Sequence, residues 1–112
     1  MTPLRIVYLV LALAGAIWPW TYNLAFIASH PGAFDAGQFV REAFSTPAGA
    51  SLSADIVLVA TVGSIWMVVE ARRLQMRFVW AYLLYGTLIA FASALPLFLF
   101  MREDAIARQR RA

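Results

Sequence analysis

The chain has 112 residues, of which 62% are hydrophobic and 13% charged, and its formal net charge is +3. A soluble domain carries about 25% charged residues, and a water-soluble fold of this length could not bury so much apolar surface. The chain contains no cysteine, which excludes disulfides, thiolate metal sites and redox motifs. All nine basic residues are arginine, and with the abundant alanine this composition is typical of a bacterial protein from a GC-rich genome.

Three long apolar stretches predict three transmembrane helices, at residues 6–28, 52–71 and 78–101. Each is long enough to cross a hydrocarbon core of about 30 Å at about 1.5 Å per residue. The first is expected to be an uncleaved span, because Trp18 and Trp20 stand where a signal peptidase needs small residues. The predicted fold is all-α and integral to the membrane, with residues 1–112 forming a single transmembrane domain.

The first span contains a proline, and a short helix follows that span. Pro19 removes one backbone donor from the helix and frees the carbonyl of Gly15, which predicts a kink. Residues 35–45 have apolar side chains at helical spacing, which predicts an amphipathic helix in the membrane interface. Asp35, with Gln38 three residues later, resembles a capping box.

The last third of the chain begins with a tight basic connection that contains Arg72 and Arg73. In the span after it, small residues recur every four positions and favour close approach of another helix; they are Gly86, Ala90 and Ala94. Pro96 permits a second bend near the end of this span. Residues 102–112 form a basic tail that we expect to fray or to lie on the membrane surface.

Asp55 and Glu70 are the candidate catalytic residues, because an ionisable group inside a span is costly and therefore a functional candidate. They lie 15 residues apart, about 22 Å along a helix, so each is near one end of the second span. The simpler interpretation of Asp55 is compensation of the helix dipole, and that of Glu70 is an ion pair with Arg73. His30 is the only histidine, and no metal site or cofactor is predicted.

Aromatic residues and one amide are the candidate ligand contacts: Trp20, Tyr22, Asn23 and Trp66. They would line a pocket for a lipid, quinone, carotenoid or isoprenoid. The alternative is that the aromatic rings are interfacial belt and packing residues. In that alternative Asn23 makes an interhelical hydrogen bond. The sequence shows no nucleophile–base pair, no glycine-rich phosphate loop and no metal-ligand cluster.

Several of these segments resemble a family of small bacterial membrane proteins catalogued as domain of unknown function 2834. The resemblance runs from about Tyr8 to Glu103, and four segments carry it: residues 19–24, 51–55, 66–76 and 94–99. It implies a three-helix membrane protein and no established activity. The chain is also distantly similar to membrane-bound terpene cyclases of fungal meroterpenoid pathways. That similarity implies Asp55 and Glu70 as acids that protonate an isoprenoid.

The sequence favours a non-catalytic accessory, assembly or lipid-interacting subunit in the membrane. The alternatives are an isoprenoid or lipid enzyme with Asp55 or Glu70 as general acid, and a small oligomeric transporter. Expected partners are membrane lipids and either copies of the chain or a larger complex. Nucleic acid is not expected, because the aromatic residues lie within the spans and not on a basic face.

The predicted location is the bacterial cytoplasmic (inner) membrane, as a multi-pass protein. With three crossings, the two possible orientations place four and five arginines in the cytoplasm, so the positive-inside rule is nearly tied. We expect a cytoplasmic N-terminus, because the second connection is purely basic whereas the first holds one arginine and two acids.

Overall fold

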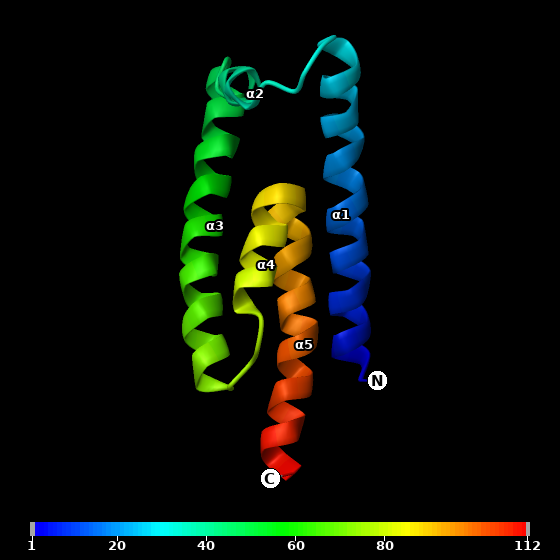
Figure 1. The fold of residues 1–112 in the computed structure, drawn as a ribbon, viewed down its shortest axis with the longest axis vertical. Coiled ribbons are helices and arrows are strands. Elements are labelled where there is room, and N and C mark those ends of the chain that lie inside the picture. Colours follow the sequence, from blue (N-terminus) through cyan, green and yellow to red (C-terminus); the bar gives the residue numbers. More distant parts are fainter. Residues whose placement is uncertain (1, 112) are drawn as a thin grey trace.

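The structure is a computed structural model that describes residues 2–111, and these residues are almost entirely helical (Figure 1). The elements in chain order are α1 (Pro3–Ser29), α2 (Ala36–Ala43), α3 (Pro47–Arg73), α4 (Val79–Tyr85), the π-helical η1 (Gly86–Ala90) and α5 (Phe91–Arg111). No strand is present between residues 2 and 111. The predicted all-α class is therefore confirmed.

Three helices are long and apolar enough, by length and composition, to cross a membrane: α1, α3 and the continuous helical run Val79–Arg111. Large apolar side chains cover the outer faces of α1 and α3, and Ile17, Leu52 and Val62 are among those left more than half exposed. A lipid environment accounts for such exposure, since hydrocarbon is a good solvent for these side chains. The short helix α2 lies between the first two long helices, as predicted.

Each of the first three helices begins at a capping residue. Thr2 caps α1, and the Asp35 carboxylate accepts from the backbone N–H of Gln38 at 3.1 Å, as the capping-box pattern indicated. For α3, the Thr46 hydroxyl accepts from the Gly49 N–H at 3.0 Å. Because Thr46 is followed by Pro47, a favoured first helical residue, α3 begins five residues before the predicted span.

The third apolar stretch turns back on itself. Tyr82 and Phe98 are sixteen residues apart, which is about 24 Å along a straight helix, yet their ring centroids are 5.5 Å apart. Tyr85 and Ser93 are likewise joined through their hydroxyl oxygens at 2.8 Å. Figure 1 shows α4 running one way, η1 at the turn and α5 returning beside α4. The stretch thus forms a helical hairpin, whereas the sequence predicted one span over residues 78–101 with a bend at Pro96.

Small residues allow the two arms of the hairpin to approach each other. A Cβ atom added to Gly86 would lie 3.1 Å from the Cβ atom of Ala94. Two of the three small residues in the predicted stripe, Gly86 and Ala94, therefore pack against each other within the same segment. The turn itself is π-helical, with the wider i to i+5 winding that often marks an irregularity inside an α-helix.

The basic tail is helical as far as Arg111, where fraying or surface association was expected. Ala105 is buried, and two ion pairs support this part of α5. Arg102 donates to Glu70 of α3 at 2.8 Å, and Arg108 donates to Asp104 at 2.9 Å. The contact with Glu70 extends the helix past the apolar stretch, because it ties the first charged turn of the tail to α3.

Helix α1 runs antiparallel to α5 and bonds to it at two levels: Arg5 Nε donates to the Phe100 carbonyl at 3.3 Å, and Ser93 Oγ donates to the Ala12 carbonyl at 2.6 Å. At a third level, Trp20 Nε1 of α1 donates to the Ile89 carbonyl of η1 at 2.7 Å. Helix α1 remains a single helix through Pro19. Between these levels Gly15 packs directly on the backbone of Ala92. The Ala92 carbonyl lacks its usual helical donor, because the residue four positions later is Pro96.

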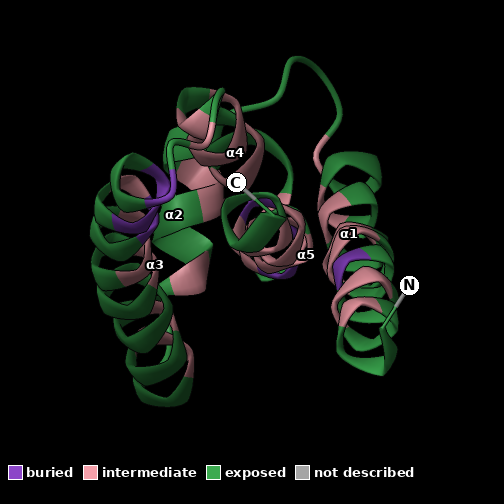
Figure 2. Ribbon diagram, turned by 90° about the horizontal axis from the view of Figure 1, so that it is seen from below, coloured by how far each residue is buried: buried purple, intermediate pink, exposed green. Residues whose placement is uncertain are grey.

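The fully buried core is small and lies where α3 meets the hairpin. Met67, Ala71 and Phe98 are each no more than 1% exposed, and Tyr82 and Leu95 pack against them. Figure 2 shows buried residues only on the faces where helices meet, with exposed residues around the outside.

Candidate functional site

A mainly apolar cavity of about 950 Å³ lies between α1 and α3, beyond the turn of the hairpin. Pro19 and Ile27 of α1 form one wall, and Ile56 and Val59 of α3 form the other. Residues 87–92 of η1 and α5 close one end. Phe34, with Ala36 and Phe39 of α2, lies across the opposite end. A cavity of this volume is large enough for a small ligand or part of a lipid.

Four residues bring polar side chains to the cavity: Trp20, Asn23, Asp55 and Thr87. Two of these side chains are already bonded to backbone, since Trp20 donates to Ile89 and Thr87 donates to the Leu83 carbonyl at 3.0 Å. Within residues 2–111 no side-chain hydrogen bond joins Asp55 or Asn23 to another residue; Asp55 is exposed and Asn23 is half-buried. A carboxylate and an amide are therefore free to bind a ligand in an otherwise apolar cavity.

Two of the four predicted ligand contacts line the cavity, and the other two lie elsewhere, apart from each other. Trp20 and Asn23 line the cavity. Tyr22 is 68% exposed on the outside of α1 and does not line it. Trp66 lies toward the other end of α3, where its ring packs on Phe98 at 5.8 Å and the Arg102 guanidinium lies 5.7 Å from the ring centroid.

The two candidate acids also lie in different environments. Asp55 lines the cavity, but Glu70 is 7% exposed and is bound by two arginines. Arg73 donates to Glu70 at 2.6 and 3.0 Å, and Arg102 donates at 2.8 Å. The expected Glu70–Arg73 pair is present, and Arg102 adds a third member from α5. A carboxylate held by two guanidinium groups is a poor proton donor, so the geometry favours a structural role for Glu70.

His30 connects the end of α1 to α2. Its Nε2 lies 2.6 Å from the Glu42 carboxylate, and its ring stacks on Phe26 with centroids 4.1 Å apart. The hydrogen bond between Nδ1 and the Phe26 carbonyl raises the pKa of His30 above 6.5, and the charge of Glu42 acts in the same direction. Hydrogen bonding to Gln38, together with His30, lowers the pKa of Glu42.

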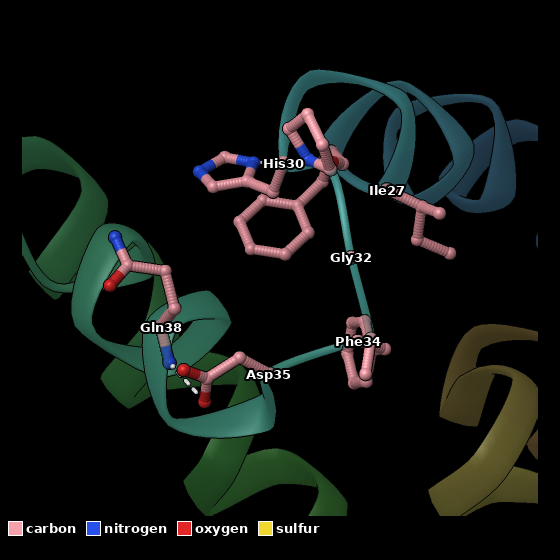
Figure 3. Close-up of a pocket in the computed structure, with 9 residues that line it drawn as sticks. Ile27, His30, Gly32, Phe34, Asp35 and Gln38 are labelled. Atoms are coloured by element: carbon pink, nitrogen blue, oxygen red, sulfur yellow. Dashed lines mark hydrogen bonds between the residues drawn. The ribbon is translucent and has the colours of Figure 1, made fainter.

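A smaller pocket of about 290 Å³ lies at this connection, between His30, Phe34 and Gln38 (Figure 3). Asp35 lines it, but its carboxylate is engaged in capping α2. No group of three histidine or acidic side chains that could hold a metal occurs within residues 2–111. The side chains at this pocket thus support the link between α1 and α2.

Sequence reasoning missed the polar contacts that hold the hairpin against α1. Ser93 is 1% exposed, donates to Ala12 of α1 and meets Tyr85 of α4. It was not singled out, because in a straight span a lone serine has no evident partner. The stripe of small residues around position 86 was the available signal for close helix contact, but it does not specify which helix makes that contact.

Three helical stretches that are long and apolar enough to cross a membrane, with exposed apolar side chains on α1 and α3, fit a small helical membrane protein. The chain belongs to the family described as Protein of unknown function DUF2834, whose model matches residues 7–104. No curated protein and no solved structure match the chain. The function must therefore be argued from the cavity and from the distribution of charge.

Proposed function

We propose that this protein is a non-catalytic, lipid-interacting subunit of the bacterial cytoplasmic membrane. The observation that carries the proposal is the cavity between α1 and α3, whose walls are mostly hydrocarbon and which contains the free Asp55 and Asn23 side chains. An apolar chain would fill the cavity. A hydroxyl or another donor at its end would bind the carboxylate. The ligand class is thus a lipid or isoprenoid with a hydrogen-bond-donating head.

Bound lipid in the purified protein tests this proposal. The protein would be isolated in mild detergent, its lipids extracted and identified by mass spectrometry, and its melting temperature measured with and without added geranylgeraniol. We expect a stoichiometric co-purifying lipid and a higher melting temperature with the alcohol. Val59→Trp places an indole in the cavity and should abolish both effects. Val62→Trp is the matched control on the lipid-facing side of α3. Equal behaviour of both variants and the wild type would contradict the proposal.

A second candidate function is an isoprenoid or lipid enzyme, and the unpaired carboxylate of Asp55 in the cavity favours it. Asp55 would be the general acid, because Glu70 is bound by two arginines. Asp55→Asn should abolish turnover of an isoprenoid substrate while leaving folding and lipid retention intact. Two results together would exclude the enzyme and support lipid binding. The wild type would convert no isoprenoid, and Asp55→Asn would no longer retain lipid.

Copies of the chain or a larger complex are the proposed protein partners, alongside membrane lipids. Only a small core is buried within one copy, and much apolar surface of α1 and α3 stays exposed. Cross-linking in native membranes, followed by light scattering in mild detergent, should show a homo-oligomer or a stoichiometric partner. A monomer by both measurements would overturn this part of the proposal.

A further inference from the structure

The depth of the hairpin in the membrane follows from its contacts with α1. Phe100, near the end of the apolar part of α5, is level with Arg5, and Ile89, near the turn, is level with Trp20. Fifteen residues of α1 separate these levels, which is about 22 Å. A hydrocarbon core is about 30 Å thick. A hairpin of this depth can enter the core without reaching its far side.

The hairpin also brings both termini to one end of the molecule, as Figure 1 shows. At this end Arg5 of α1 donates to the Phe100 carbonyl of α5, and Arg73 of α3 and Arg102 of α5 both donate to Glu70. Arg77 and Arg108 line one shallow pocket at the same end. The last turns of α5 continue beyond Arg102 for nine residues, about 13 Å.

The consequence is a strong separation of charge. Every arginine except Arg41 lies at the end that holds the termini, which carries eight arginines and three acids. The opposite end has one arginine and three acids, namely Asp35, Glu42 and Asp55. A straight third span divides the arginines almost evenly, whereas the hairpin divides them eight to one.

We propose that the third apolar stretch is a re-entrant hairpin that enters and leaves the bilayer on one side, and that the basic end is a surface for the anionic headgroups of the cytoplasmic leaflet. Both termini then lie in the cytoplasm, since arginine-rich ends are retained there and attracted to anionic lipids. Most of the arginines at this end are exposed, although Arg73 and Arg108 also pair with acids of the chain. This proposal is independent of the ligand in the cavity.

Single cysteines can test the topology directly, because the native chain has none. Thr2→Cys, Ala33→Cys and Gln109→Cys would each be exposed to a membrane-impermeant maleimide, first in spheroplasts and then in inverted vesicles. We expect Ala33→Cys to react in spheroplasts, and Thr2→Cys and Gln109→Cys to react only in inverted vesicles. Reaction of Gln109→Cys together with Ala33→Cys would establish a third crossing and overturn the proposal.

A double-cysteine variant tests the hairpin in the native membrane. The pair Gly86→Cys with Ala94→Cys should form a disulfide on mild oxidation, because the two Cβ positions are in contact. The pair Ile56→Cys with Ser64→Cys is the matched control, since it has the same sequence separation within the continuous helix α3. Oxidation of neither pair, with both variants inserted in the membrane, would contradict the hairpin.

Defined lipids test the headgroup surface. The melting temperature of the detergent-solubilised protein would be measured with added phosphatidylglycerol or phosphatidylcholine. Phosphatidylglycerol should raise the melting temperature more than phosphatidylcholine does. The combined variant Arg108→Gln, Arg110→Gln and Arg111→Gln should reduce the difference between the two shifts at least by half. Equal shifts with both lipids would exclude an anionic headgroup surface, and a basic end bound to protein or nucleic acid would then be the alternative.

Discussion

Glu70 joins two helices through one carboxylate. Its side chain is almost fully buried and receives hydrogen bonds from Arg73 of α3 and Arg102 of α5. Trp66 lies one turn before Glu70 and beside Arg102, so the ring shields the cluster. These bonds fix the register of α5 against α3, because a slip of α5 would remove Arg102 from the buried Glu70 carboxylate.

Replacing Glu70 with glutamine should destabilise the protein by about 2–4 kcal/mol, since it leaves two arginines without their counter-ion. The measurement is the free energy of unfolding in mixed micelles. Asp104→Asn is the matched control, because it removes only the exposed i,i+4 pair with Arg108 and should cost less than about 0.5 kcal/mol. Equal losses in the two variants would show that Glu70 does not hold the helices together.

Ser93 is a second residue whose substitution should destabilise the contacts between helices. Ser93→Ala removes the hydrogen bond to the Ala12 carbonyl and the contact with Tyr85, and should cost about 1 kcal/mol. Tyr85→Phe should lose less, and the double variant should cost less than the two losses added together, because both variants break the same hydroxyl contact. Additive losses in a double-mutant cycle would contradict the shared contact.

Among the elements, α1 and α5 approach most closely at Gly15. A methyl group there would meet the backbone of Ala92 and Ser93, which cannot move as a side chain could. Gly15→Ala should therefore destabilise the protein by about 1–3 kcal/mol. Gly37→Ala on α2 is the control, since its added methyl meets only side chains and a helix gains about 0.5–1 kcal/mol from the change. Thermal unfolding in detergent should move in opposite directions for the two variants.

The junction between α1 and α2 should depend on pH. The raised pKa of His30 makes its pairing with Glu42 fully effective below pH 6.5, and the effect is lost as the pH rises through the raised value. Because the pKa of Glu42 is lowered, ionised Glu42 stabilises the junction fully above pH 4.5. That stabilisation is lost as the pH falls through the lowered pKa. The junction should be tightest between about pH 4.5 and 6.5.

A spin label at Gly37→Cys on α2 measures this dependence. We expect its mobility to increase between pH 6 and pH 9, because deprotonated His30 no longer pairs with Glu42 (reference pKa about 6.5). In a His30→Gln background the mobility should stay constant over that range. A pH-independent label in the native background would show that the Phe26 contacts with Phe34 and Phe39 hold the junction alone.

The elements differ in how far the sequence predicts them. Apolar length predicts α1 and α3, and the Asp35 cap with helical periodicity predicts α2, because these signals are local. The fold-back of α4 on α5 is not local, since Tyr82 and Phe98 are each ordinary in a span and meet only in space.

The sequence predicts the site only in part. Asp55, Trp20 and Asn23 are candidates from residue type and do line one cavity. Tyr22 and Trp66 are candidates on the same ground but do not line it. Residue type indicated the candidates, but the turn of the hairpin determines which of them share the cavity.

At the scale of the whole molecule, one end is basic and the other slightly acidic. The proposed orientation rests on this difference, so the balance of arginines should control it. The basic end has eight arginines and the other end has one, so removing any single arginine should leave the orientation unchanged. The nearly even count obtained from a straight third span would instead make the orientation sensitive to small changes.

Redistributing arginines should disturb the orientation. The combined variant Arg108→Gln, Arg110→Gln and Arg111→Gln leaves five arginines against one and should insert as the wild type does. A second variant adds Ala33→Arg, Ser45→Arg and Ala48→Arg to these three changes. It has five arginines at the basic end and four at the opposite end, and it should insert in mixed orientations. The Thr2→Cys label reports both outcomes in spheroplasts and inverted vesicles. A uniform orientation of the second variant would mean that arginine balance does not set it.

The pairing of α1 with α5 has a consequence for biogenesis. The first helix to leave the ribosome is held by η1 and α5 at the end of the chain, across separations of 69 to 95 residues. Contacts of such long range form late. Until synthesis ends, the indole N–H of Trp20 therefore lacks the carbonyl that it bonds in the finished molecule. A newly inserted α1 therefore lies in the lipid with the Trp20 indole N–H lacking its acceptor. An insertase or chaperone that binds polar groups would act at this stage.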